Sequence, residues 1–230
     1  MTLSTRTADE AKGDNVRAMG EELGLLYDAL WQQVAWLHRK WSEYVVLFGT
    51  KESRIALLNQ TAPSFFRIMQ DSLWEDVLLH VARLTDPPKS AGRANLSVQR
   101  LPDAISHEET RATVGAKIVE AQAASAFCRD WRNRHIAHRD LRLALSLEAE
   151  PLKPASREKV GHALDALSAV INTVAVHYVG STTYFNLGAE AGGAMSLLYL
   201  LDGGIRAEQL KREQLKSGRY DLIDFKPREL

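Results

Sequence analysis

Long stretches of this chain repeat hydrophobic residues every three or four positions, which is the spacing of one face of an amphipathic helix. This pattern predicts a helix over residues 16–49 and another over residues 63–84. The prolines within residues 86–88 end the second helix, because proline cannot continue one. The same spacing predicts a long helix from residue 108 into residues 130–140, and a further helix over residues 156–178.

Shorter segments complete the predicted organisation. We expect short helices over residues 51–59 and 96–106, a loop over residues 86–95, and a polar helix over residues 205–217 after a turn at Gly203-Gly204. No convincing set of paired strands is visible, so the fold is predicted to be an all-α bundle with additional C-terminal helices. The change in composition after Gly180 suggests a helical domain over residues 1–180 and a C-terminal extension and tail over residues 181–230.

Composition narrows the class of protein. Lys and Arg number 29 and Asp and Glu number 29, so no global positive field draws the chain to nucleic acid, and any such contact needs a local patch. The single cysteine, Cys128, excludes an internal disulfide and fits a reducing cytoplasm. No signal-peptide core is visible, and the longest apolar run, residues 194–201, is shorter than the roughly 20 residues of a membrane span. A cytoplasmic protein without membrane contact is expected.

Residues 130–140, DWRNRHIAHRD, carry the densest candidate chemistry. An arginine can hold a phosphate, and histidine is the side chain that exchanges protons near neutral pH. Residues 129–142 contain five arginines and two aspartates, a local excess of positive charge that suits a few salt-sensitive phosphate contacts. A structural interpretation weighs equally: a histidine on an apolar helix face and arginines beside aspartates are ordinary features of a packed, ion-paired helix.

Helix geometry constrains a site in this segment. Arg132 and His138 are six residues apart, which is about 240° around an ideal helix, so they do not face one point. Arg134 and His138 are four residues apart and do share a face, and His135 and His138 continue the apolar stripe of Cys128. Either the helix is distorted near His138, or a second copy of the chain completes the site.

A metal site is the third interpretation of the same residues. His135-x-x-His138 with Asp130 or Asp140 offers two nitrogens and a carboxylate. Two histidines without a distant further ligand are weak evidence, and the neighbouring arginines would repel a dication. We therefore predict neither a metal nor another cofactor.

Three stretches of the chain resemble a known family. Arg132-Asn133-x4-His138 matches the R-x4-6-H signature of the HEPN superfamily, which commonly has a polar residue after the arginine. The order and spacing of three segments resemble the abortive-infection AbiU-type branch over roughly residues 20–180: Trp41-Ser42-Glu43-Tyr44 to Leu47-Phe48-Gly49, Ala82-Arg83-Leu84-Thr85-Asp86-Pro87, and Trp131-Arg132-Asn133 to Ile136-Ala137-His138-Arg139-Asp140.

The resemblance implies a HEPN-like helical bundle that dimerises through the motif helices and cleaves RNA without a metal. His138 would move a proton at the 2′-hydroxyl or the leaving oxygen, Arg132 would stabilise charge on the phosphate, and Asn133 would orient the pair. Arg134, His135 and Arg139 lie outside the signature and are assigned a supporting role in RNA backbone contact. Asp86 is expected to cap or pair with a motif arginine.

The resemblance also implies a biological setting, a phage-defence or toxin component held in check by an antitoxin or regulatory protein. Some HEPN proteins are not catalytic, so a second function stays open. In that alternative the chain is a helical interaction or nucleotide-binding module that dimerises through the same arginine and histidine segment.

Overall fold

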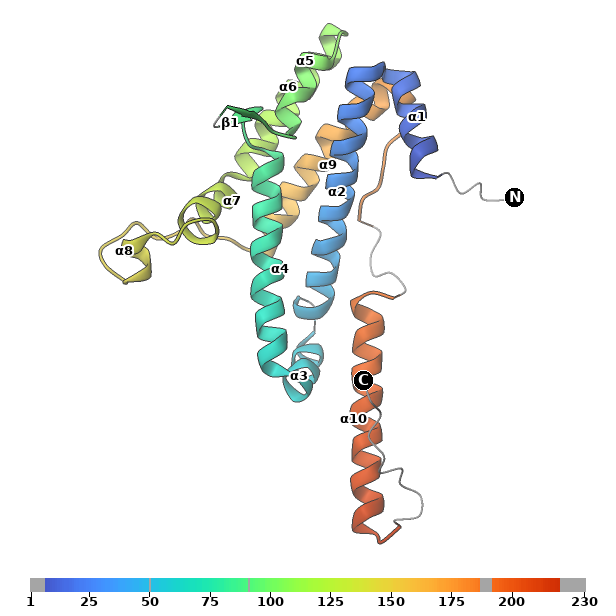
Figure 1. Cartoon of the computed structure of the whole chain (residues 1–230), viewed down its shortest axis with the longest axis vertical. Helices are drawn as coiled ribbons and strands as arrows, with labels where there is room; N and C mark the ends of the chain where they lie inside the picture. The colour runs from blue at the N-terminus through green and yellow to red at the C-terminus, as the bar shows by residue number, and fades with distance from the viewer. Residues whose placement is uncertain (1–6, 50, 91, 187–191, 220–230) are drawn as a thin grey trace. The chain divides into compact units, whose positions relative to one another are not determined.

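The computed structural model describes residues 7–49, 51–90, 92–186 and 192–219, and it confirms the predicted all-α class. Helices account for almost all regular structure in these residues (Figure 1). In chain order the elements are α1 (Ala8–Met19), α2 (Glu21–Phe48), α3 (Glu52–Thr61), α4 (Pro63–Leu84), β1 (Lys89–Ser90), β2 (Arg93–Ala94), a 3-10 turn η1 (Val98–Arg100), α5 (Leu101–Ala104), α6 (Glu108–Ala124), α7 (Ala126–Trp131), a π turn η2 (Arg132–Ile136), α8 (Leu141–Ala144), α9 (Arg157–Val179) and α10 (Ala194–Lys216).

The chain divides into two compact units. Residues 1–42 and 72–187 form the first unit, and residues 43–71 and 188–230 form the second. The boundary predicted after residue 180 concerns the extent of the family-like domain and stays a prediction. No helix of the described residues is long and apolar enough to cross a membrane.

The core of the first unit joins α2, α4, α6 and α9. The hydrophobic stripes read from the sequence supply it, and α9 contributes eight buried residues. Its fully buried large side chains include Leu30, Leu37, Leu78, Leu101, Leu164, Leu167 and Ile171. A smaller core in the second unit contains Leu47, Leu58, Phe66, Ala194 and Leu198.

The first predicted helix is two helices. Gly20 has φ +83°, a backbone conformation that non-glycine residues rarely adopt, and it ends α1 before α2 begins. The two helices then approach closely at Gly24, where an added Cβ would lie 2.6 Å from the Cα of Val16. Hydrophobic spacing runs on across this break, which is why the sequence pattern alone predicted one helix.

Two further predictions were wrong in detail. The loop over residues 86–95 contains a short antiparallel hairpin, with Lys89 opposite Ala94. The glycine pair Gly203-Gly204 lies inside α10 rather than in a turn. Each helical glycine costs about 1 kcal/mol relative to alanine, and the strong helix formers that follow the pair offset that cost.

A partly buried polar cluster links α2 to α4. Lys40 Nζ lies 2.5 Å from Asp76 Oδ2 and 3.2 Å from Nδ1 of His80, which is 2 % exposed. Burial, together with the charges of Lys40 and Arg83, lowers the pKa of His80 to about 4. Burial also lowers the pKa of His38, whose Nε2 lies 2.8 Å from Ser168 Oγ.

These two histidines make the fold acid-sensitive. Between pH 6.5 and about 4 the unfolded chain binds a proton at position 80 that the folded chain does not, so the free energy of unfolding falls as pH falls. We expect urea midpoints to decrease from pH 7 to pH 4.5, and the decrease to be smaller in His80→Gln. His162→Gln, at an exposed position, is the control and should keep the full decrease. Equal pH dependence in wild type and His80→Gln would contradict this account.

Candidate functional site

A buried polar network fixes the start of the arginine and histidine segment. The predicted long helix breaks at Ser125, which is fully buried and whose Oγ donates to Thr85 Oγ1 at 3.0 Å. Arg129 Nη1 donates to both hydroxyls at 3.1 Å, and its Nη2 donates to the Gln122 carbonyl at 2.7 Å. These bonds hold α7 against the C-terminal end of α4, so the segment from residue 130 onward leaves the bundle at this point (Figure 1).

The helix is distorted where the motif begins. Residues Arg132–Ile136 form a π turn, in which the Ala137 amide donates to the Arg132 carbonyl at 2.8 Å. The Asp140 amide then donates to the Arg134 carbonyl at 3.0 Å, and Asp140 begins α8 as its N-cap. The bond from the Leu143 amide, with the positive charge of Arg134, lowers the pKa of Asp140. π turns are rare in proteins, and those that are found often lie at functional sites.

Arg132 is held between two oxygen acceptors. Its Nη1 pairs with Asp86 Oδ2 at the end of α4, and its Nε donates to Asn133 Oδ1 at 2.9 Å. The Arg132 and Asp86 side chains are 23 % and 18 % exposed, so the pair is largely shielded from water. The prediction that Asp86 pairs with a motif arginine is confirmed. The Nη2 group of Arg132 has no partner among the described residues, and its donors remain available to an anion.

His138 and Arg139 face solvent. Both lie after the π turn in non-helical backbone, both are exposed, and neither has a hydrogen bond or an ion pair within the described part of the chain. The expectation that His138 continues the apolar stripe of Cys128 was therefore wrong, because the break at Ser125 and the π turn end the straight helix. No hydrogen bond or ion pair joins His138 to Arg132 within the described residues of one chain.

Arg134 anchors the following loop rather than pointing to solvent. Its guanidinium donates to the carbonyls of Glu150 and Pro151 and lies 3.6 Å from carboxylate oxygens of Asp130 and Asp140. The Lys153 amide donates to Asp130 Oδ2 at 2.8 Å, which ties the same loop to α7. Arg134 does not share a helix face with His138, because Arg134 lies within the π turn and His138 lies in the non-helical backbone after it.

His135 sits at the end of a row of aromatic rings. Its ring contacts the Trp131 ring edge to face with centroids 5.3 Å apart, and Trp131, Trp74 and Trp41 follow at 6.4 and 6.1 Å. His135 Nε2 also lies 3.4 Å from Glu75 Oε1 on α4. These contacts hold the His135 ring in place, and the His135 side chain remains 26 % exposed.

The three residues assigned to RNA backbone contact share one cavity. Arg134, His135 and Arg139 line a space of about 370 Å³ together with Asp140 and residues of the loop around α8. Its volume is at the lower end of the range for small-molecule sites, about 300–1,000 Å³. The free guanidinium of Arg139 and the His135 ring offer a positive charge and an aromatic face, the two features that bind phosphate and a base.

The metal interpretation finds no geometric support. No group of three or more His, Cys, Asp or Glu side chains in the described residues is arranged to hold a metal ion. Asp130 and Asp140 instead face Arg134, and His135 faces Glu75. Burial raises the pKa of the only cysteine, Cys128, to about 12, so this thiol is neither a ready ligand nor a nucleophile.

A protein-family model matches most of the chain. The HEPN family model described as AbiU2 matches residues 20–194, more than half of the chain. The matched region includes Asp86 and all six residues predicted for the site. Comparisons with curated proteins and with solved structures give no significant match.

Proposed function

Because the chain belongs to the AbiU2 family of HEPN proteins, a family associated with abortive infection, we propose that it is a metal-independent endoribonuclease. HEPN proteins are typically ribonucleases. The observation that carries the proposal is the Arg132 guanidinium, which Asp86 and Asn133 hold with an open Nη2 group. Arg132 begins a π turn, and His138 is exposed to solvent just after that turn.

Arg132 and His138 have different roles in the proposed reaction. Arg132 donates hydrogen bonds to the scissile phosphate and stabilises the charge that develops on it, while Asp86 and Asn133 keep the guanidinium in place. His138 moves a proton at the 2′-hydroxyl or at the leaving oxygen. Attack by the 2′-hydroxyl on the phosphorus breaks the bond to the 5′ oxygen and gives a 2′,3′-cyclic phosphate and a 5′-hydroxyl. A terminal phosphate forms when water then opens the cyclic phosphate.

The experiment that tests this function uses EDTA. Purified protein and mixed cellular RNA are incubated at low salt, with and without the chelator, and the products are separated on a gel. Equal cleavage in both conditions supports the proposal. Cleavage that disappears with EDTA, or that is unchanged in His138→Ala, contradicts it.

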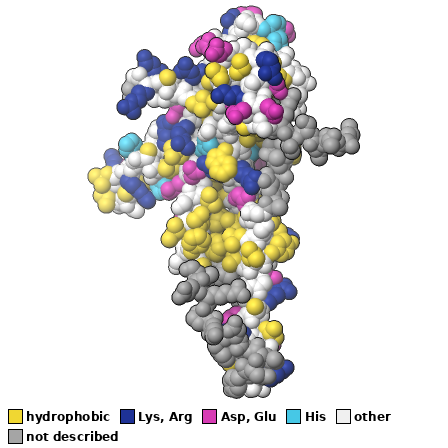
Figure 2. Space-filling view, turned by 45° about the vertical axis from the view of Figure 1, so that its right-hand side comes forward, with side chains coloured by type: hydrophobic (Ala, Val, Ile, Leu, Met, Phe, Trp, Pro, Cys, Tyr) yellow, Lys and Arg dark blue, Asp and Glu magenta, His cyan; other side chains and the backbone are white. Residues whose placement is uncertain are grey.

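A homodimer completes the site in this proposal. No hydrogen bond or ion pair joins His138 to Arg132 among the described residues, and the segment that follows His138 exposes hydrophobic side chains beside basic ones (Figure 2). Leu141, Leu145 and Leu147 are 70 %, 59 % and 55 % exposed. Burying these leucines against a second copy would bring two motif segments together around one cleft.

The leucines give a direct prediction. Leu145→Asp should place a charge in the dimer contact and raise the dissociation constant at least about tenfold, corresponding to about 1.4 kcal/mol. Analytical ultracentrifugation over a series of protein concentrations measures this dissociation constant. Val119→Asp, an exposed position on α6, is the matched control and should dissociate like wild type. A wild-type protein that is monomeric at all concentrations would contradict the composite site.

The same leucines favour the second candidate, a non-catalytic interaction or nucleotide-binding module that dimerises through this segment. It predicts a stable dimer and no RNA cleavage by wild type. In either case we propose a phage-defence or toxin role in the cytoplasm, with an antitoxin or regulatory protein as a partner. The family association with abortive infection supports this setting.

A further inference from the structure

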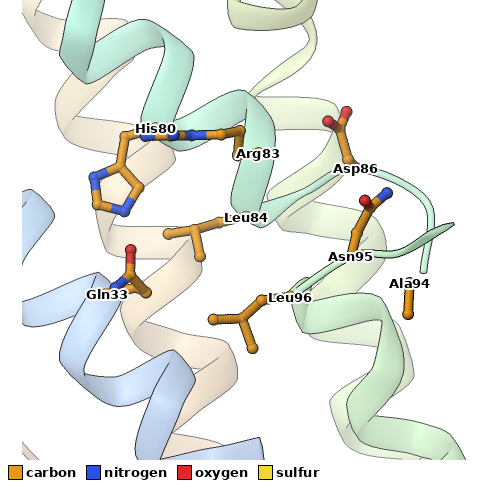
Figure 3. Close-up of a pocket in the computed structure, with 8 residues that line it drawn as sticks. All are labelled: Gln33, His80, Arg83, Leu84, Asp86, Ala94, Asn95 and Leu96. Carbon is orange, nitrogen blue, oxygen red and sulfur yellow. The ribbon is translucent and has the colours of Figure 1, made fainter. Parts of the chain in front are cut away.

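A second cavity lies at the C-terminal end of α4, away from the loop around α8. It encloses about 280 Å³, and Figure 3 shows the side chains that surround it. Gln33 comes from α2, His80 and Arg83 come from α4, and Leu96 follows the β1–β2 hairpin. None of these four residues has a role in the function proposed above.

His80 presents an unused donor to this cavity. Lys40 Nζ lies 3.2 Å from His80 Nδ1, and an ammonium only donates, so Nδ1 is the acceptor and Nε2 carries the proton. The Nε2 atom is buried and has no hydrogen-bond partner. In Figure 3 the ring extends from α4 toward Gln33. A buried N–H group without an acceptor is unfavourable, so a ligand that supplies an acceptor would bind more tightly.

Arg83 supplies a positive charge at the same cavity. It is exposed, and it forms no ion pair with any described carboxylate. Its charge is one of the causes that keep His80 neutral, which places the two groups within electrostatic reach. Gln33, whose side-chain amide has no partner among the described residues, adds an NH2 donor and an oxygen acceptor, and in Figure 3 the oxygen lies on the side of the His80 ring.

Asp86 also lines this cavity. Its Oδ2 atom pairs with Arg132, its Oδ1 atom is buried without a hydrogen-bond partner, and in Figure 3 the carboxylate is turned away from the His80 ring. The part of the cavity around His80 therefore presents one cation, Arg83, and the neutral donors of His80 and Gln33 to a ligand. A cationic ligand would be repelled by Arg83, and an apolar one would leave the His80 Nε2–H unsatisfied.

We propose that this cavity binds a phosphate group, taken either from the RNA strand that is cleaved at Arg132 or from a free nucleotide. One phosphate oxygen accepts from His80 Nε2 and another from Arg83. The volume suits a phosphate and part of its sugar rather than a whole nucleotide. Because Asp86 lines the cavity and also holds Arg132, the subsite adjoins the motif. The RNA source rests on the proposed function, whereas phosphate binding itself does not.

The test follows the His80 side chain by NMR in full-length His138→Ala protein with ¹⁵N-labelled histidine. Inorganic phosphate is titrated at constant ionic strength with chloride as the reference, and a short oligoadenylate RNA is titrated in a second series. The His80 signals are those missing from the spectrum of His80→Gln or, if that variant does not fold, those that stay neutral to the lowest pH. Phosphate should shift the Nε2 resonance.

Two variants report on the binding groups without disturbing the core. Arg83→Gln should weaken phosphate binding about tenfold, since a hydrogen bond to a charged group is lost. Leu96→Trp should fill the cavity and abolish the shift. Arg111→Gln removes a similarly exposed arginine on α6 that does not line the cavity, and it should bind like wild type.

The outcomes separate the proposal from the proposed function. A shift with both phosphate and RNA, weakened by Arg83→Gln, supports the cavity and identifies the RNA strand as the source. A shift with phosphate alone supports the cavity and assigns it to a free nucleotide. No shift with either ligand, or an unchanged shift in both cavity variants, overturns the proposal, even if the Arg132 site cleaves RNA.

Discussion

His138→Ala should reduce the rate of RNA cleavage by about 10²–10⁴-fold, the usual contribution of a general acid or base. The effect should appear in the rate constant for cleavage rather than in RNA binding, because His138 moves a proton and is not the group that holds the phosphate. His138 is exposed and has no partner within the described residues, so its replacement should leave the melting temperature unchanged.

A second exposed histidine is the control for removing an imidazole side chain. His162 on α9 is also exposed and lies outside the motif, and His162→Ala should cleave RNA like wild type. Single-turnover cleavage of a labelled RNA in EDTA measures all three proteins. A His138→Ala protein that retains more than about a tenth of the wild-type rate would remove this residue from the mechanism.

Arg132→Gln should lower the cleavage rate about 10²–10³-fold, the typical effect of removing one charge-stabilising donor. The substitution also leaves Asp86 without its cation, and that carboxylate is 18 % exposed. We therefore expect a lower melting temperature as well as lower activity. Arg132→Lys should recover part of the stability but little activity. A single ammonium cannot reproduce the planar guanidinium, which donates to Asp86, Asn133 and a phosphate at the same time.

Asp86→Asn tests whether the ion pair positions Arg132. The amide keeps the side chain volume but loses the charge, so we expect a partial loss of activity that does not add to the loss in Arg132→Gln. We would measure cleavage rates and melting temperatures of the two single variants and the double variant. Non-additive losses of activity would show that Asp86 acts through Arg132. Faster cleavage by Asp86→Asn would mean that the pair holds Arg132 away from the substrate, contrary to the positioning role.

The sequence predicted the helices well where hydrophobic spacing is long and uninterrupted. The stripes of α4 and α9 pack into the core as expected, because their burial follows directly from the spacing. The breaks at Gly20 and Ser125 were missed, since the hydrophobic pattern continues across both. The break at Ser125 depends on a hydrogen bond to Thr85, and a contact between residues so far apart in the chain leaves no local signal.

The candidate site could also be predicted only in part, because some of its contacts have a signal in the sequence and others do not. The resemblance led to Arg132 and to its pairing with Asp86, which the structure shows. Sequence geometry also required either a distorted helix or a second copy, and the π turn supplies the distortion. The loop contacts of Arg134 and the unpartnered Nε2 of His80 could not be predicted, because both arise from tertiary packing.

The most direct test of the proposed reaction is the chemistry of the RNA ends. Wild-type protein is incubated with a short RNA in EDTA, and the fragments are identified by mass spectrometry. Fragments that end in a 2′,3′-cyclic phosphate or a terminal phosphate, with 5′-hydroxyl partners, and that are absent with His138→Ala, are the result we predict. Fragments with 3′-hydroxyl and 5′-phosphate ends, or the same fragments with His138→Ala, would contradict cleavage by Arg132 and His138.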